Sequence, residues 1–167
     1  GAVLDVACSP FNDYLVASAS EDGNGRIWSI PEGGLTDKHL TDPVQTLIGH
    51  RRKVGSISFH PTAANIVATS STDYSVKLWD IETGDAKLTV PGHADIIQSL
   101  AWNRNGSRIV TTSKDKKVRV LDPRSEKVAI EYTGHPGVKG SRALWLGSGE
   151  TETIFTVGFS RSSDRSF

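Results

Sequence analysis

The sequence has one cysteine, no long apolar run and no net charge, and each absence excludes a class of protein. Cys8 alone cannot build a disulfide framework, and its place in the alternating stretch 3–8 predicts a small buried residue rather than a reactive thiol. No apolar run approaches the roughly 18 residues of a membrane-spanning helix, and residues 1–5 lack the basic and apolar layout of a signal peptide. A net charge of zero is not typical of nucleic-acid binders. We therefore expect a cytoplasmic protein without a membrane span or a nucleic-acid partner.

Motifs that carry catalysis are also missing. The histidines and the cysteine do not have zinc-ligand spacing, and the sequence contains no nucleophile elbow, Walker loop or dinucleotide fingerprint. Asp73 and Asp115 could be mistaken for a catalytic acid pair, but the repeat described next places them in separate structural units. We expect no enzyme activity, no metal site and no cofactor.

What the sequence does contain is a repeat. One copy opens with Gly-His at 49–50 and closes with Trp-Asp at 79–80. A second copy runs from Gly-His at 92–93 to Leu-Asp at 121–122, about 42 residues further on, and a third begins with Gly-His at 134–135. Such marks at a period of about 40–45 residues are typical of WD40 repeats, each of which forms a four-stranded blade of a β-propeller. The sequence therefore predicts an all-β WD40 propeller.

Four polar residues of the copy at 49–91 can satisfy one another inside an apolar blade. The spacing predicts that His50 bonds to Thr69 and Asp73, and that the indole N–H of Trp79 completes the network. The same offsets give Ser18, Asp22 and Trp28 in the preceding copy, and His93, Thr111 and Asp115 in the following copy, where Leu121 replaces the tryptophan.

The strand and turn pattern divides the chain 1–167 into three blades and half of a fourth, at 1–48, 49–91, 92–133 and 134–167. Residues 31–43 form a longer loop, of a kind that often carries contacts. In the last unit Asp164 takes the role of Asp115, and the third and fourth strands are absent. Because propellers close at about four to eight blades, we expect an incomplete ring. We expect this fragment of a larger propeller to expose apolar blade faces and to have low stability on its own.

Charge is unevenly distributed along the chain. Residues 1–50 hold seven of the 19 acidic and two of the 19 basic residues, so residues 51–167 carry a net charge of +5. Two adjacent repeats contain clusters of basic residues, which are Arg51, Arg52 and Lys53 in one and Lys114, Lys116, Lys117, Arg119 and Arg124 in the other. Any one of them can be an ordinary solvated side chain, but together they predict a docking surface for an acidic partner. The arginines carry most weight, because a guanidinium pairs a carboxylate through two bonds.

Strings between the repeat marks are more specific than the repeat itself. They resemble coronins from Gly1 to about Arg165, and they are VLDVA at 3–7, PFND at 10–13, ASASEDG at 17–23, IWSIPEGGL at 27–35, GHRRKVG at 49–55, HPTA at 60–63, KDKKVR at 114–119, DPR at 122–124 and TVGFSR at 156–161. Other WD40 proteins share the Gly-His and Trp-Asp marks without these strings.

The resemblance implies the N-terminal part of a seven-bladed propeller, from a protist or other lower-eukaryote coronin. It implies binding to filamentous actin, regulation of filament organisation and turnover, and a location on the cytoplasmic actin cytoskeleton. The actin-branching complex and cofilin are further partners that the resemblance implies. A C-terminal coiled coil, which this chain does not contain, would supply oligomerisation.

Two alternatives remain open beside actin binding. One is a general WD40 scaffold or adaptor for another protein complex, in which case the coronin-like strings are coincidental. The other is an enzyme built on a propeller, which needs a catalytic constellation that the sequence does not show.

Overall fold

The structure, a computed structural model, describes residues 1–35 and 39–167. These residues form fifteen strands in four antiparallel sheets and two short 3₁₀ helices. The first sheet contains β1 (Val3–Cys8), β2 (Leu15–Ser20), β3 (Gly25–Ser29) and β4 (Gln45–Leu47), and the second contains β5 (Val54–Phe59), β6 (Ile66–Ser71), β7 (Val76–Asp80) and β8 (Ala86–Val90). The third contains β9 (Ile97–Trp102), β10 (Ile109–Ser113), β11 (Lys117–Asp122) and β12 (Lys127–Thr133), and the fourth contains β13 (Arg142–Leu146), β14 (Thr153–Phe159) and β15 (Arg165–Ser166). The 3₁₀ helices are η1 (Pro123–Ser125) and η2 (Gly149–Thr151).

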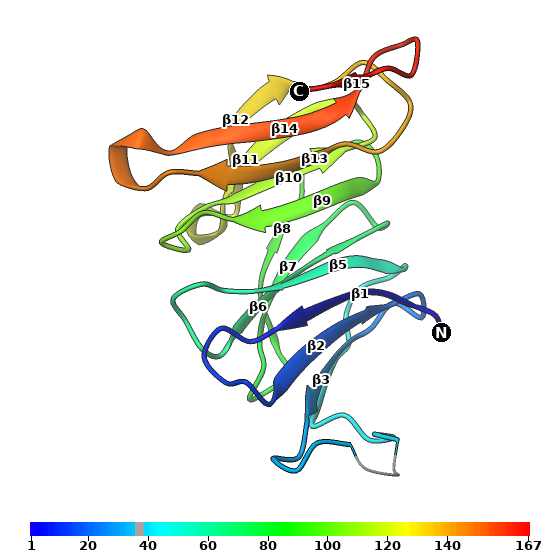
Figure 1. Cartoon of the computed structure of the whole chain (residues 1–167), viewed down its shortest axis with the longest axis vertical. Coiled ribbons are helices and arrows are strands. Elements are labelled where there is room, and N and C mark those ends of the chain that lie inside the picture. Colours follow the sequence, from blue (N-terminus) through cyan, green and yellow to red (C-terminus); the bar gives the residue numbers. More distant parts are fainter. Residues whose placement is uncertain (36–38) are drawn as a thin grey trace.

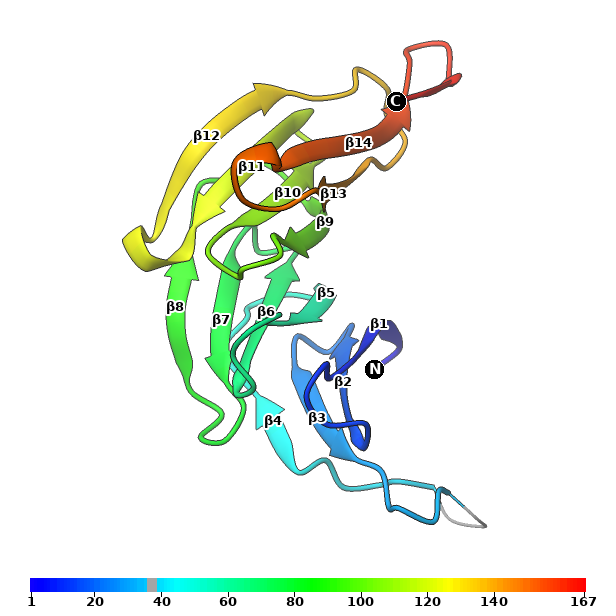
Figure 2. The same cartoon turned by 60° about the vertical axis from the view of Figure 1, so that its left-hand side comes forward.

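The four sheets follow one another in chain order, from the blue sheet at the N-terminus to the red sheet at the C-terminus (Figure 1). Seen from the side they lie along an arc, with the first strand of each sheet on the inner side and the fourth strand of the first three sheets on the outer side (Figure 2). This is the radial arrangement of propeller blades, and it confirms the predicted all-β, incomplete WD40 propeller.

The core lies between successive sheets, because strands such as β6 carry apolar side chains on both faces. In β6, Val67 packs against the first sheet, in a cluster with Ile27 and Leu47, whereas the next residue, Ala68, packs against the third sheet. Successive side chains of a strand point to opposite faces, so the two middle sheets contribute to two cores each. Trp79 is fully buried between the first and second sheets.

The fourth sheet differs from the sequence-based expectation. A short third strand, β15, pairs with β14 through Gly158 and Ser166, so the prediction that this strand is absent was wrong. A strand that pairs through two residues is too short to give an alternating pattern. It also follows the polar segment 160–164, so the sequence did not indicate it.

The inner strand of the first sheet is more open than expected. Cys8 is exposed, and Val3 and Val6 are 59% and 56% exposed. The prediction of a buried Cys8 was wrong, because β1 packs against β5 on one face and no described element covers its other face. In the part of the chain that the structure describes, no helix has the length and apolar character needed to cross a membrane.

Candidate partner-binding surface

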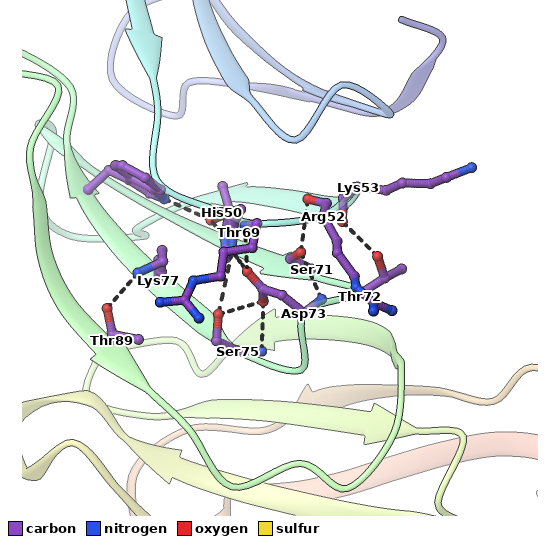
Figure 3. Close-up of polar contacts among 12 residues, drawn as sticks. His50, Arg52, Lys53, Thr69, Ser71, Thr72, Asp73, Ser75, Lys77 and Thr89 are labelled. Carbon is purple, nitrogen blue, oxygen red and sulfur yellow. Dashed lines mark hydrogen bonds and ion pairs between the residues drawn. The ribbon is translucent and has the colours of Figure 1, made fainter.

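The second sheet holds a closed polar network at one end of its strands. His50 Nε2 lies 2.7 Å from Thr69 Oγ1, and His50 Nδ1 lies 2.9 Å from Asp73 Oδ2. The indole N–H of Trp79 donates to the same Thr69 Oγ1 at 2.7 Å. The turn that carries Asp73 is fixed by Ser75, whose hydroxyl donates to Asp73 Oδ1 at 2.6 Å (Figure 3). The structure thus brings together the four residues that the repeat spacing singles out.

Burial and hydrogen bonding determine which atoms of this network donate and which accept. Burial lowers the pKa of His50 despite the carboxylate beside it, so the imidazole is neutral. Burial acts to raise the pKa of Asp73, but hydrogen bonds from Ser75, the Arg51 N–H and His50 hold it well below its usual value. His50 Nδ1–H therefore donates to the carboxylate, and Nε2 accepts the Thr69 hydroxyl proton. Every donor then has an acceptor, which lets a polar group sit in an apolar blade at little cost.

The first sheet contains a shorter version. Trp28 Nε1–H donates to Ser18 Oγ at 2.8 Å, as Trp79 does to Thr69. Asp22 instead forms a two-bond pair with Arg26, at 2.8 Å and 3.3 Å. The Arg26 guanidinium, with the Asn24 N–H, lowers the pKa of Asp22 to about 2 although burial acts against it.

The third sheet rearranges the network around an arginine. His93 Nε2 lies 2.9 Å from Thr111 Oγ1, but Asp115 turns to Arg119, 2.7 Å away, and His93 Nδ1 has no hydrogen-bond partner among the described residues. Arg119 stands opposite Thr111 in the β10–β11 pairing, and it also reaches Glu131 on β12 at 2.9 Å. Although burial acts to raise it, this guanidinium holds the pKa of Asp115 below its usual value.

Arg119 is therefore not a docking residue. Its side chain is 3% exposed and is enclosed by two carboxylates, so the prediction that it lies on the partner surface was wrong. The repeat explains this burial. Arg119 occupies the same strand position as Lys77 in the second sheet, opposite the threonine of the network, which is Thr111 for Arg119 and Thr69 for Lys77.

The fourth sheet departs furthest from the pattern. The turns at 20–23, 71–74, 113–116 and 160–163 share one backbone hydrogen bond, from the last residue's N–H to the first residue's carbonyl. This equivalence puts Ser162, not Asp164, in the place of Asp115, so the role predicted for Asp164 was wrong. His135 packs beside Gly158 and bonds instead to Thr156 and Ser166, at 3.0 Å and 2.8 Å.

Six basic side chains share one end of the second and third sheets. They lie in the segment leading into β5 and in the β10–β11 turn, which antiparallel topology places at the same end of the strands. All six are exposed, and we call them the basic rim, comprising Arg51, Arg52, Lys53, Lys114, Lys116 and Lys117. Lys53 pairs with Glu21 and Lys117 with Glu131, while the other four have no ion pair among the described residues. The rim therefore keeps an excess of positive charge.

Arg124 lies elsewhere. It is exposed in η1, which connects β11 to β12 at the opposite end of the strands. The prediction that Arg124 belongs to one surface with Lys114 and Lys116 was wrong, because one strand length separates the two loops. The two loops are close in sequence, because only the strand β11 separates them. The sequence alone does not show that they lie at opposite ends of that strand.

Sequence analysis missed the acidic partners Glu21 and Glu131. Glu131 stands directly opposite Arg119 in the β11–β12 pairing. Aligning the predicted strands in antiparallel register provides a signal for this pair, since opposite charges face one another across neighbouring strands. In residues 1–35 and 39–167 no group of three His, Cys, Asp or Glu side chains is placed to hold a metal ion. The long loop predicted at 31–43 includes residues 36–38, which lie outside the described residues.

Comparison with known proteins agrees with this geometry. The WD domain, G-beta repeat family matches residues 1–29, 41–80 and 84–122. A coronin-like protein of Schizosaccharomyces pombe is 46% identical over 98% of this chain and 27% of its own length, and human Coronin-2A is 42% identical over 99% of this chain and 32% of its own. The crystal structure of the WD40 domain from Toxoplasma gondii coronin superposes with a TM-score of 0.91 at 31% identity, covering 98% of this chain and 42% of that one. The chain thus spans about a quarter to a third of the length of these two relatives. With its Gly-His and Trp-Asp marks, its four stacked sheets and these matches, this chain belongs to the WD40-repeat family.

Proposed function

We propose that this chain is part of a coronin-type protein that binds actin filaments and regulates their organisation and turnover. Similarity to coronins over nearly its whole length supports the proposal. The observation that carries it is the basic rim, because six exposed cations at one end of two adjacent sheets suit the acidic surface of an actin filament.

The rim suits a rigid docking role. Arg51 is anchored at its backbone, where its N–H donates to the partly buried Asp73 carboxylate at 3.1 Å. The carbonyl oxygen of Arg52 accepts a hydrogen bond from the hydroxyl of Ser71 at 3.1 Å. The network of the second sheet therefore fixes the loop from which the two guanidinium groups project, which lowers the entropy lost on docking.

Other properties belong to the same proposal. The protein acts as a scaffold rather than as a catalyst, in the cytoplasm on the actin cytoskeleton. The actin-branching complex and cofilin are its functional partners, and a coiled coil outside this chain supplies oligomerisation in a longer protein.

Co-sedimentation with actin filaments tests the proposal. We expect the double variant Arg51→Glu, Arg52→Glu to weaken filament binding about tenfold or more, since it reverses two unpaired charges. Binding of the unmodified protein should also weaken as salt rises from about 50 to 200 mM, because salt screens exposed charges.

The matched control is Arg104→Glu, which reverses one exposed charge in the loop between β9 and β10, at the opposite end of the strands. It should leave sedimentation unchanged. If Arg104→Glu and the rim variant weaken binding equally, net charge rather than the rim is responsible. A protein that does not sediment at low salt would instead favour a scaffold for another complex.

A further inference from the structure

A second candidate site lies at the end of the strands opposite the basic rim. A cavity of about 190 Å³ opens at the seam between the second and third sheets. Apolar side chains form most of its wall, including Ile66, Leu78, Leu88, Trp102 and Pro123. Pockets for whole small molecules are larger, at about 300–1,000 Å³. The cavity therefore has room for one side chain of a partner.

His60 contributes a neutral wall to this cavity. Its Nε2 lies 3.0 Å from the carbonyl oxygen of Gly106, and its Nδ1 accepts the N–H groups of Thr62 and Ala63 at 3.1 Å and 3.0 Å. Nε2 therefore carries the proton, and burial lowers the pKa of this imidazole. Both ring nitrogens are occupied, so His60 presents its ring and packs edge-on against Trp102, 4.5 Å between centroids.

Two side chains of the lining differ in whether their donors can be reached. The Nε1–H of Trp102 has no hydrogen-bond partner among the described residues, but the nitrogen is buried and the ring alone lines the cavity. Arg124 is exposed and forms no ion pair with them, although its backbone is fixed by a bond from its N–H to Asp122 Oδ1 at 3.0 Å. Lys87, the other cation, lies 3.8 Å from Asp80 and 3.7 Å from Asp85.

The lining contains no carboxylate, and Arg124 is its one cation without an ion pair among the described residues. The site thus combines an apolar recess with an unused guanidinium at its mouth.

We propose that this seam cavity binds a carboxylate-bearing peptide segment of a partner protein. An aliphatic side chain of the peptide fills the recess between Ile66 and Trp102, and a neighbouring carboxylate pairs with Arg124. The site is independent of actin binding through the basic rim, because it lies at the other end of the strands.

A labelled acetyl-Glu-Leu-Asp-Asp peptide tests this directly, with anisotropy measuring affinity and the ¹H–¹⁵N signal of the Trp102 indole reporting contact. Trp102→Phe identifies that signal. We expect the peptide to shift the Trp102 signal, and Arg124→Gln to weaken binding about tenfold, as loss of a charged hydrogen bond does.

Arg51→Gln and an acetyl-Lys-Leu-Lys-Lys peptide are the controls, and we expect unchanged affinity for the first and no binding for the second. Arg124→Gln should also leave actin sedimentation unchanged, so the two proposals can fail separately. An unshifted Trp102 signal at saturating peptide would overturn the proposal, as would equal affinity of Arg124→Gln and the unmodified protein. Arg124-dependent binding of phosphatidylserine vesicles without peptide binding would assign the site to a membrane instead.

Discussion

Trp79 donates its indole N–H to the hydroxyl oxygen of Thr69, 2.7 Å away, at a position where neither residue is exposed to solvent. The same oxygen serves His50, so one hydroxyl joins three elements of the second sheet. This shared oxygen is the point at which the polar network is most sensitive to substitution.

Replacing Thr69 with valine should destabilise the fold by about 2–4 kcal/mol. The change keeps the shape but leaves the indole N–H of Trp79 and the Nε2 of His50 without partners, and each buried unpaired group costs about 1–3 kcal/mol. Urea denaturation followed by tryptophan fluorescence measures the change. Thr133→Val, on the exposed outer strand β12, is the control and should alter stability by less than about 0.5 kcal/mol. Similar losses in both variants would contradict the network.

Replacing Arg119 with leucine should destabilise the third sheet by about 3–5 kcal/mol, because Asp115 loses its buried partner and the charge of Glu131 is left unbalanced. Filament binding per folded molecule should not change, since Arg119 is buried. Denaturation and co-sedimentation of the same samples separate the two effects. Arg104→Leu removes an exposed arginine and should leave stability nearly unchanged; a weakened filament affinity of folded Arg119→Leu protein would return this residue to the docking surface.

Stability should fall as the pH decreases from about 6.5 to 4. Burial, with the Arg119 charge nearby, lowers the pKa of His93 from 6.5 in the unfolded chain to about 4 in the fold. Between these values the unfolded chain holds a proton that the folded chain does not, so the free energy of unfolding decreases with falling pH. His50 acts in the same direction, and the contribution of Asp73 is lost below about pH 3.8.

The pH dependence can be assigned by substitution. His93→Gln keeps a polar side chain without titrating, and it should flatten the profile between pH 6.5 and 4 without abolishing it. His39→Gln, at an exposed position, should leave the profile unchanged. Thermal denaturation at half-unit pH steps provides the measurement, and identical slopes for His93→Gln and the unmodified protein would refute this account.

Gly106 should not tolerate a side chain. Its φ is +75°, and an added Cβ would lie 2.0 Å from Cε1 of His60. Gly106→Ala should therefore cost about 2 kcal/mol or more, from backbone strain and from displacement of the His60 ring. Gly33→Ala is a matched control, because a Cβ there meets nothing within 4 Å. Thermal melting of the two variants compares them, and equal melting temperatures would argue against a fixed His60.

Most of the fold could be predicted from the sequence, because the repeat couples strand order to a few spaced marks. Seven strands have the bounds that their alternation and flanking turn residues predict, and they are Val3–Cys8, Leu15–Ser20, Val54–Phe59, Ile66–Ser71, Ala86–Val90, Ile97–Trp102 and Arg142–Leu146. Others differ by one or two residues at their ends. The two-residue strand β15 could not be predicted, because its pairing depends on a turn of 160–163 whose sequence lacks the aspartate of the other turns.

The site was less predictable than the fold. Spacing identified His50, Thr69, Asp73 and Trp79, because their roles repeat. It could not show that Arg119 is buried, since burial there depends on Glu131 from the next strand. Spacing also could not show that Arg124 and Lys116 lie at opposite ends of β11. The end of a strand at which a loop lies follows from the topology of the sheet rather than from local sequence. The seam cavity is built from seven segments of the second and third blades, and no local pattern indicates it.

The turns that carry the network also affect the stability of the basic rim. The same turn position has a left-handed backbone in all four sheets, with φ of 89° at Gly23, 71° at Tyr74, 66° at Lys116 and 70° at Ser163. Residues other than glycine lose about 1 kcal/mol there. Tyr74 and Lys116 thus keep side chains where a glycine would make the molecule more stable. Lys116 is thus a strained residue of the basic rim, and exchanging it for glycine should yield a sturdier protein that adheres less well.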